Sequence, residues 1–230
     1  MAAFQKAVAA GVDMVELDVR MTKDFHLVVH HDRSVRRTTG GKGNIWNMTL
    51  QELRTLDAGS WFNPKFYRER IPTLREVLEF LLPTNVGINI EVKTDGDPRK
   101  GAHLEECVIL VIMEKRFDER TLVSSFDHKF LKNVHSLFPA IKTGALYHPV
   151  RDVRKKPSAL CTNIGASAFV CSRTQINKKM VLDAKSKKLV VACYGVNTPQ
   201  HFAEVLDLGV DAVVTDWPEK LRRAIHNKAR

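Results

Sequence analysis

The sequence predicts an α/β protein built as a (β/α)8 barrel of the TIM type, and three observations lead to this fold class. Seven short runs rich in Val, Ile and Ala alternate with helical patterns along the 230 residues. Such alternation is typical of a parallel sheet with crossover helices. The apolar fraction of 44% is enough for a buried core. Two of the runs also carry polar residues on one face, which favours a barrel over an open sheet.

The predicted elements follow in order along the chain, and a helix over 2–10 comes first. Strands are predicted at 14–19, 87–93, 121–126, 142–147, 166–170, 189–194 and 211–215. Helices are predicted at 73–82, 103–116, 127–137, 175–187, 198–208 and 218–227. Thr73 and Glu76 have the spacing of a capping box, which marks the start of a helix. Gly209 is placed to end the helix over 198–208.

The polar strand faces decide between the two common parallel architectures. Glu16 and Asp18 share one face of the first predicted strand, and Glu91 and Lys93 share one face of the second. In an open doubly wound sheet, helices would cover both faces of a central strand, and both faces would be apolar. A polar second face favours a barrel whose strand ends line a site at its mouth.

A complete barrel has eight parallel strands, whereas the pattern yields seven. The run 27–30 follows the first strand too closely for a parallel crossover, so the turn at 22–25 predicts a local hairpin instead. This hairpin begins a small insertion over 19–72. No strand precedes the helix over 2–10, so we expect a single barrel domain over 1–230 that lacks its first strand. The neighbouring strands would then have exposed edges, through which the chain could self-associate.

Charge and composition narrow the classes of partner. The formal net charge is +10, which favours anionic partners such as phosphates or phospholipid headgroups. We find no nucleic-acid-binding motif and expect no nucleic acid partner. No apolar stretch reaches the 18 residues of a membrane span. The four cysteines have no CxxC spacing, which predicts reduced thiols and a cytoplasmic protein.

The acidic residues of the two polar strand faces form a candidate metal site. Glu16 and Asp18 lie about 6.6 Å apart along the strand, with side chains on the same side. Glu91 can complete the set from another strand. Three carboxylates are a suitable shell for Mg²⁺ or Ca²⁺ and a poor one for Zn²⁺. The alternative is a structural network in which Lys93 and Arg20 neutralise these acids.

His31 is the candidate for proton transfer, because Asp32 follows it and could orient its ring. The alternative is an ordinary loop pair. If the predicted hairpin forms, His31 comes close to Glu16 and Asp18, which favours a catalytic role. Lys93 is placed to bind a phosphate oxygen, or else to form an ion pair with Glu91 or Asp18.

Several longer motifs identify a family resemblance that covers nearly the whole chain. They read VELDVRMTKD at 15–24, VVHHDRSVRRTTGGKG at 28–43, INIEVKT at 88–94 and GVDAVVTDWP at 209–218. With them, the sequence resembles the glycerophosphodiester phosphodiesterases, which are TIM-barrel enzymes. The resemblance implies a divalent cation, Mg²⁺ or Ca²⁺, held by Glu16, Asp18 and Glu91. It also implies that His31 is one of two catalytic histidines, that Lys93 contacts the phosphate, and that 19–72 is the family's insertion.

The sequence also departs from the family pattern. The family opens with a strand ending in His-Arg-Gly, which supplies the other catalytic histidine, and this chain begins after that point. Cys193 to Asn197 replaces a Trp-Thr-Val-Asn motif, so an aromatic wall of the substrate pocket is lost. We expect a true start roughly 20 residues upstream, the length of the missing strand and its turn, in preference to a defective copy. The chain as given is then expected to have weak activity or none.

The function implied by the resemblance is that of a phosphoric diester hydrolase in phospholipid-derived lipid metabolism. It would cleave a glycerophosphodiester such as glycerophosphocholine into glycerol 3-phosphate and an alcohol. Two alternatives stay open at this point. One is a catalytically impaired barrel that binds anionic phospholipid or a partner chain. The other is a related barrel with phospholipase D-like chemistry.

Overall fold

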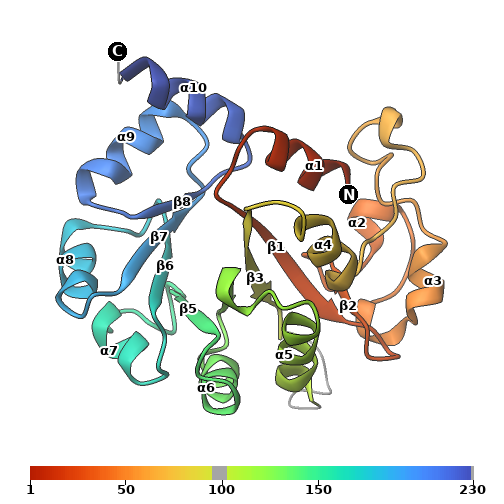
Figure 1. Ribbon diagram of the computed structural model, residues 1–230, viewed down its shortest axis with the longest axis horizontal. Coiled ribbons are helices and arrows are strands. Elements are labelled where there is room, and N and C mark those ends of the chain that lie inside the picture. The colour runs from red at the N-terminus through yellow and green to blue at the C-terminus, as the bar shows by residue number, and fades with distance from the viewer. Residues whose placement is uncertain (95–102, 229–230) are drawn as a thin grey trace. The chain divides into compact units, whose positions relative to one another are not determined.

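Two polar faces and a hairpin, all expected from the sequence, are found in the first part of the structure. The computed structural model, shown in Figure 1, describes residues 1–94 and 103–228. Its contacts divide the chain into two units, Met1–Thr121 and Leu122–Arg230. The single domain over 1–230 therefore stays a prediction.

The sheet of the first unit is built around one long strand. After helix α1 (Ala2–Ala9), strand β1 (Met14–Met21) pairs in parallel with β3 (Gly87–Val92). Strand β2 (Leu27–Val29) pairs antiparallel with the far end of β1. The hairpin predicted around 22–25 is therefore confirmed, and its turn is closed by the amide of Thr22, which donates to the carbonyl of His26 at 2.9 Å.

Between β2 and α4, the chain forms a small substructure with its own core. It contains α2 (Arg36–Thr39), η1 (Ile45–Asn47), α3 (Leu50–Arg54) and η2 (Pro64–Phe66). Five fully buried side chains form the core of this segment: Val28, Val35, Ile45, Leu53 and Ile71. Its base is closed, because the amide of Val29 donates to the carbonyl of Pro72 at 2.8 Å. The boundaries 19–72 remain a prediction.

The first unit continues with α4 (Leu74–Leu81), α5 (Leu104–Glu114) and η3 (Asp118–Arg120). The capping box predicted for Thr73 and Glu76 is present, with each residue accepting from the backbone of the other. Helix α4 buries one face, whose residues recur at helical spacing: Leu74, Val77, Leu78 and Leu81. This apolar stripe explains why a short helix is stable here.

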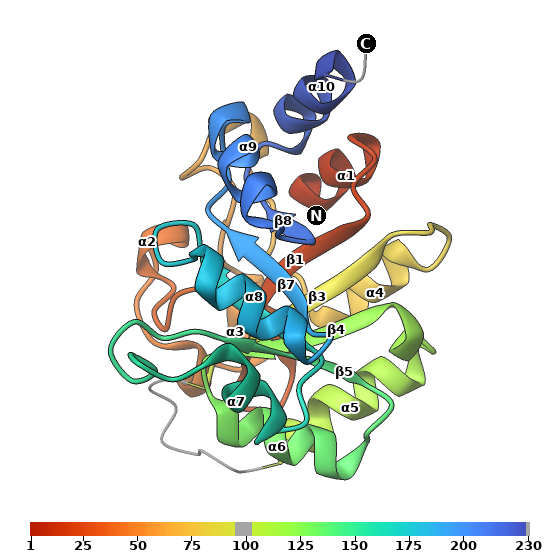
Figure 2. The same cartoon turned by 90° about the vertical axis from the view of Figure 1, so that its left-hand side faces the viewer.

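The second unit repeats strand and helix with regular alternation. Its parallel strands pair in chain order: β4 (Thr121–Ser125), β5 (Lys142–Leu146), β6 (Ala168–Ser172), β7 (Val190–Tyr194) and β8 (Ala212–Val214). The connecting and closing helices are α6 (His128–Leu137), α7 (Pro157–Thr162), α8 (Lys178–Ser186), α9 (Pro199–Leu208) and α10 (Pro218–Lys228). Helices α7 and α8 lie side by side in Figure 2. Gly209 ends α9 in the left-handed conformation, φ 89°, as predicted.

These elements confirm the fold class. All seven strands predicted for the barrel form, and the short antiparallel β2 is the eighth strand. Among the described residues, α1 rather than a strand precedes β1. The protein thus has the α/β, TIM-type fold without its opening strand. In the described part of the chain, no helix combines the length and the apolar character that a membrane span requires.

Candidate active site

The three predicted metal ligands come together in the structure. The parallel register places Asp18 opposite Glu91, and Glu16 opposite Asn89. Each of the three acids offers one oxygen atom, and these atoms all lie within 4.8 Å of one another. The two acids of β1 reach the same side because alternate residues of a strand point to the same face. Their neighbours Val15 and Leu17 are buried on the other face, which fixes the strand's orientation.

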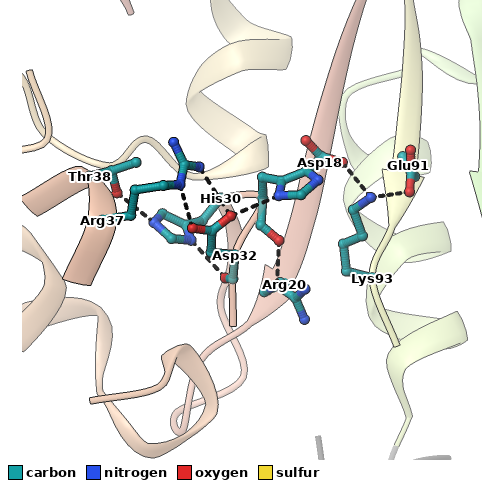
Figure 3. Close-up of polar contacts among 9 residues, drawn as sticks. Asp18, Arg20, His30, Asp32, Arg37, Thr38, Glu91 and Lys93 are labelled. Atoms are coloured by element: carbon teal, nitrogen blue, oxygen red, sulfur yellow. Dashed lines mark hydrogen bonds and ion pairs between the residues drawn. The ribbon is translucent and has the colours of Figure 1, made fainter. Parts of the chain in front are cut away.

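Lys93 follows β3 and lies against this acidic cluster, as Figure 3 shows. Its Nζ is 3.0 Å from Oδ1 of Asp18, and it also forms an ion pair with Glu91. Burial alone would lower the pKa of Lys93, but the two carboxylates outweigh burial and raise it. Lys93 is therefore a fixed positive charge at neutral pH.

The pKa of Glu91 moves in the direction expected for a carboxyl group in a crowded acidic site. Burial raises the pKa of Glu91, and the nearby charge of Asp18 raises it further, against the opposing effect of Lys93. Three carboxylates gather beside one ammonium, so negative charge is in excess among these four residues. Such an arrangement favours a bound cation.

His31 lies beside the acidic cluster because backbone contacts of the hairpin hold it there. The amide of His30 donates to the carbonyl of Asp18 at 2.9 Å, which ties the end of β2 to β1. Nε of Arg20, a buried residue of β1, donates to the carbonyl of His31 at 3.0 Å. The charge of His31 also acts on Glu91. The expected proximity of His31 to the acids thus has a structural basis.

The ring of His31 is oriented by a carboxylate that is itself held by an arginine. Nδ1 of His31 is 2.8 Å from Oδ1 of Asp32. Nε of Arg37 donates to Oδ2 of Asp32 at 2.6 Å, and a second guanidinium nitrogen donates to Oδ1 at 3.0 Å. The guanidinium of Arg37, with His31, holds the pKa of Asp32 well below its usual range. The ionised carboxylate of Asp32 therefore accepts a hydrogen bond from Nδ1–H of His31 and leaves Nε2 as the nitrogen for proton exchange.

His30, the residue before His31, has a structural role. It is buried, and its Nδ1 lies 2.8 Å from the carbonyl oxygen of Asp32. Its Nε2 lies 2.9 Å from the hydroxyl of Thr38. Burial lowers the pKa of His30, so the neutral ring is favoured. His30 thus fixes the backbone that carries the His31–Asp32 pair.

Sequence reasoning did not anticipate a second polar cluster, which follows β4 and β5 in the second unit. The buried carboxylate of Asp152 accepts from the amide of His148 at 2.9 Å and pairs with Lys155 at 3.0 Å. Nε2 of His128 donates to the carbonyl of Leu146 at 3.0 Å and lies 4.0 Å from Asp152. These contacts fold the loop between β5 and α7. The signal in the sequence was two histidines and an aspartate just after two predicted strands.

The donor set of the acidic cluster suits a hard divalent cation. Carboxylate oxygens are the ligands that Mg²⁺ and Ca²⁺ prefer, and the cluster contains neither Cys nor His. The residues present therefore fit the cation that the resemblance implies. Together, the fold and this cluster define a TIM-type α/β protein with an acidic site, an oriented imidazole and a half-buried lysine.

Comparison with known proteins agrees with this description. The model of the glycerophosphoryl diester phosphodiesterase family matches residues 1–220. A glycerophosphodiester phosphodiesterase of Caldanaerobacter subterraneus is 37% identical over 220 residues, covering 96% of this chain and 88% of the relative. One from Bacillus altitudinis is 34% identical over 223 residues, covering 96% and 89%.

A solved structure supports the same conclusion for the fold. An Oleispira antarctica phosphodiesterase, in complex with its product sn-glycerol-3-phosphate, has a TM-score of 0.84 and 28% identity. The match covers 98% of this chain and 90% of the other. The chain described here belongs to the glycerophosphoryl diester phosphodiesterase family.

Proposed function

We propose that this protein hydrolyses glycerophosphodiesters, giving glycerol 3-phosphate and an alcohol, in the metabolism of phospholipid-derived compounds, and that the chain as given does so weakly. A divalent cation, Mg²⁺ or Ca²⁺, would be held by Glu16, Asp18 and Glu91. The observation that carries the proposal is the approach of these three acids to within 4.8 Å of one another. Membership of the family supports it independently.

The protein's own residues have distinct tasks in this reaction. Lys93 would bind a non-bridging phosphate oxygen, because it is a fixed ammonium beside the acidic cluster. Nε2 of His31 would transfer a proton to or from an oxygen of the substrate, and Asp32 would hold the ring in the required tautomer. When bound, the cation would neutralise the charge that builds on the phosphate oxygens.

Cation binding can be tested without turnover. Ligands that bind only the folded state stabilise it, by about 2.7 kcal/mol at a hundredfold excess over Kd. We expect Mg²⁺ or Ca²⁺ to raise the Tm of the parent chain in calorimetry, and Glu16→Gln to remove most of this rise. The control is Glu119→Gln, an exposed carboxylate of η3, which should respond like the parent. An equal rise in Glu16→Gln would eliminate the metal site.

The reaction itself is tested by release of glycerol 3-phosphate from glycerophosphocholine with and without the cation. A bis-aryl phosphodiester is assayed in parallel, because its leaving group departs without a proton from the protein. We expect Glu16→Gln to slow both substrates by about two orders of magnitude. His31→Ala should slow glycerophosphocholine cleavage by about 10² to 10⁴. Cation-independent turnover, or unchanged rates in both variants, would contradict the proposal.

A further inference from the structure

A group of aromatic and basic side chains near η2 is exposed, although large aromatic residues are usually buried. Phe62 is 70% exposed, Tyr67 65% and Trp61 50%. With their neighbours they form what we call the aromatic–basic patch: Trp61, Phe62, Lys65, Phe66, Tyr67 and Arg68. The rings touch in series, since Trp61 and Phe62 meet edge to face at 5.8 Å and Phe62 lies 6.0 Å from Phe66. Contiguous exposed apolar surface of this kind marks an interaction site.

The backbone beneath the patch is held by many hydrogen bonds. The carboxylate of Asp57 accepts from the amides of Gly59, Ser60 and Arg68 and from the Ser60 hydroxyl. A Cβ on Gly59 would lie 2.0 Å from the carbonyl oxygen of Phe66, so the two arms of the loop pack in direct contact. Trp61 donates its indole N–H to the carbonyl of Ala58 at 3.0 Å. The rings are thus presented on a preorganised loop, which reduces the entropy cost of binding.

Positive charge accompanies each part of the patch. Nζ of Lys65 lies 5.0 Å from the centre of the Phe66 ring, and the Arg68 guanidinium lies 5.3 Å from that of Tyr67. The carboxylate of Asp57, which lies beneath the patch, is engaged elsewhere because it binds the loop backbone. The patch therefore combines exposed rings with cations, and the chain as a whole carries +10.

The patch adjoins the candidate active site. The guanidinium of Arg37, which holds Asp32 beside His31, also lies 5.3 Å from the centre of the Trp61 ring. The contacts run without interruption from His31 through Asp32 and Arg37 to Trp61. A surface that bound the patch would therefore lie next to the candidate proton-transfer group.

We propose that the aromatic–basic patch docks this protein on the surface of an anionic phospholipid bilayer. Trp and Tyr rings favour the membrane–water interface, where Lys and Arg can meet lipid phosphates. Aromatic residues and Arg are also enriched in protein–protein interfaces, but the basic residues of the patch and the net charge of +10 favour an anionic lipid surface. The rings would enter the headgroup region while Lys65 and Arg68 bind phosphates. The inference does not depend on the proposed hydrolysis, since docking is measured without turnover.

Vesicle sedimentation tests the proposal with residues 1–230. We expect binding to vesicles of equimolar phosphatidylcholine and phosphatidylglycerol to exceed binding to phosphatidylcholine alone, and to weaken at high salt. Phe62→Ser should lower the partition coefficient about tenfold, and Lys65→Gln about fivefold. The matched controls are Leu110→Ser, 65% exposed on α5, and Lys132→Gln, exposed on α6. Both should bind like the parent.

Insertion of the rings has its own readout. Brominated lipid should quench part of the parent's tryptophan fluorescence, and Trp61→Phe should remove that part while binding persists. Thermal melts establish that each variant is folded. Absence of vesicle binding, equal losses in the patch and control variants, or quenching that Trp61→Phe leaves unchanged would overturn the proposal. So would patch-dependent self-association in sedimentation velocity without vesicle binding, because it would assign the patch to a second copy of the chain.

Discussion

The imidazole of His31 is held by groups from three segments of the chain. Asp32 fixes its ring nitrogen, Arg37 from α2 fixes Asp32, and Arg20 from β1 fixes its backbone carbonyl. The ring itself is 63% exposed, so packing does little to orient it. Orientation therefore depends on the hydrogen bond to Asp32, and Asp32 and Arg37 are positioning residues.

This dependence yields a prediction for Asp32→Asn. The amide keeps the shape of the side chain but can present an N–H to His31, which would reverse the ring tautomer. We expect kcat to fall between about ten- and a hundredfold, with KM little changed. Nitrogen chemical shifts of His31 in NMR should report the change of tautomer. Arg33→Met, on the same loop, is the control, and a normal tautomer in Asp32→Asn would refute the orienting role.

Asp152 provides a residue-scale prediction for pH. Burial alone would raise its pKa, but the amide of His148 and the charge of Lys155 outweigh burial and hold the pKa below 3.8. A carboxyl group whose folded pKa is lowered adds stability above its unfolded pKa and loses it as pH falls through the folded value. We therefore expect Asp152→Asn to cost about 1–3 kcal/mol at pH 7.

The cost of Asp152→Asn should shrink below pH 4, as the parent's carboxylate takes up its proton. Urea unfolding of both proteins at neutral and acidic pH measures the difference in free energy of unfolding. Asp183→Asn, in α8, offers a comparison at another aspartate. A cost that stays constant down to pH 2 would show that the charge of Asp152 contributes nothing.

At the scale of elements, helix α4 fixes the point at which the inserted segment rejoins the barrel. Thr73 caps α4, and its backbone also bridges to Val28 of β2. Glu76 accepts from the Thr73 amide at 2.7 Å and pairs with Arg54 of α3. One capping box thus connects a barrel helix, the hairpin and the helix of the inserted segment.

Removal of this cap should therefore destabilise the protein. Thr73→Ala takes away the hydroxyl that accepts from the Glu76 amide, and we expect a loss of about 1 kcal/mol in the free energy of unfolding. Thr73→Ser retains the hydroxyl and should recover most of it. Urea titrations of the two variants and the parent supply the measurement. If the alanine and serine variants were equally unstable, the hydroxyl would not be the cause.

The elements that the sequence predicted have a different physical origin from the elements that it missed. Strands and long helices follow from apolar periodicity, and the two-residue spacing of Glu16 and Asp18 placed both on one face. Helix α7 escaped prediction because it has only 6 residues and begins at Pro157 directly after a loop. The contact of Arg37 with Asp32 was not predicted because no periodicity relates the two residues, and only the folded turn brings them together.

At the scale of the whole molecule, the chain has two units but we propose a single domain. Both units contain parallel strands and helices of one fold type, and the family match runs across both. If the two units form one domain, we expect them to unfold together in one cooperative transition. The tryptophans can report on each unit, since Trp46 and Trp61 belong to the first and Trp217 to the second.

Cooperativity is tested by unfolding in urea with fluorescence detection. Trp217→Phe leaves only the reporters of the first unit, and the double variant Trp46→Phe, Trp61→Phe leaves only that of the second. We expect both curves to have the midpoint and slope that circular dichroism gives for the same variant. Separate midpoints for the two units, beyond the shifts caused by the substitutions, would indicate two domains.

The closed base of the inserted segment has a consequence for how members of this family can diversify. Val29 and Pro72 are hydrogen-bonded to each other, so the polypeptide leaves the sheet and rejoins it at nearly the same point. The segment between these two residues can therefore change in size and sequence while the strands of the sheet keep their register. Natural variation or grafting in this segment could change what a member of the family binds without changing the three carboxylates of β1 and β3.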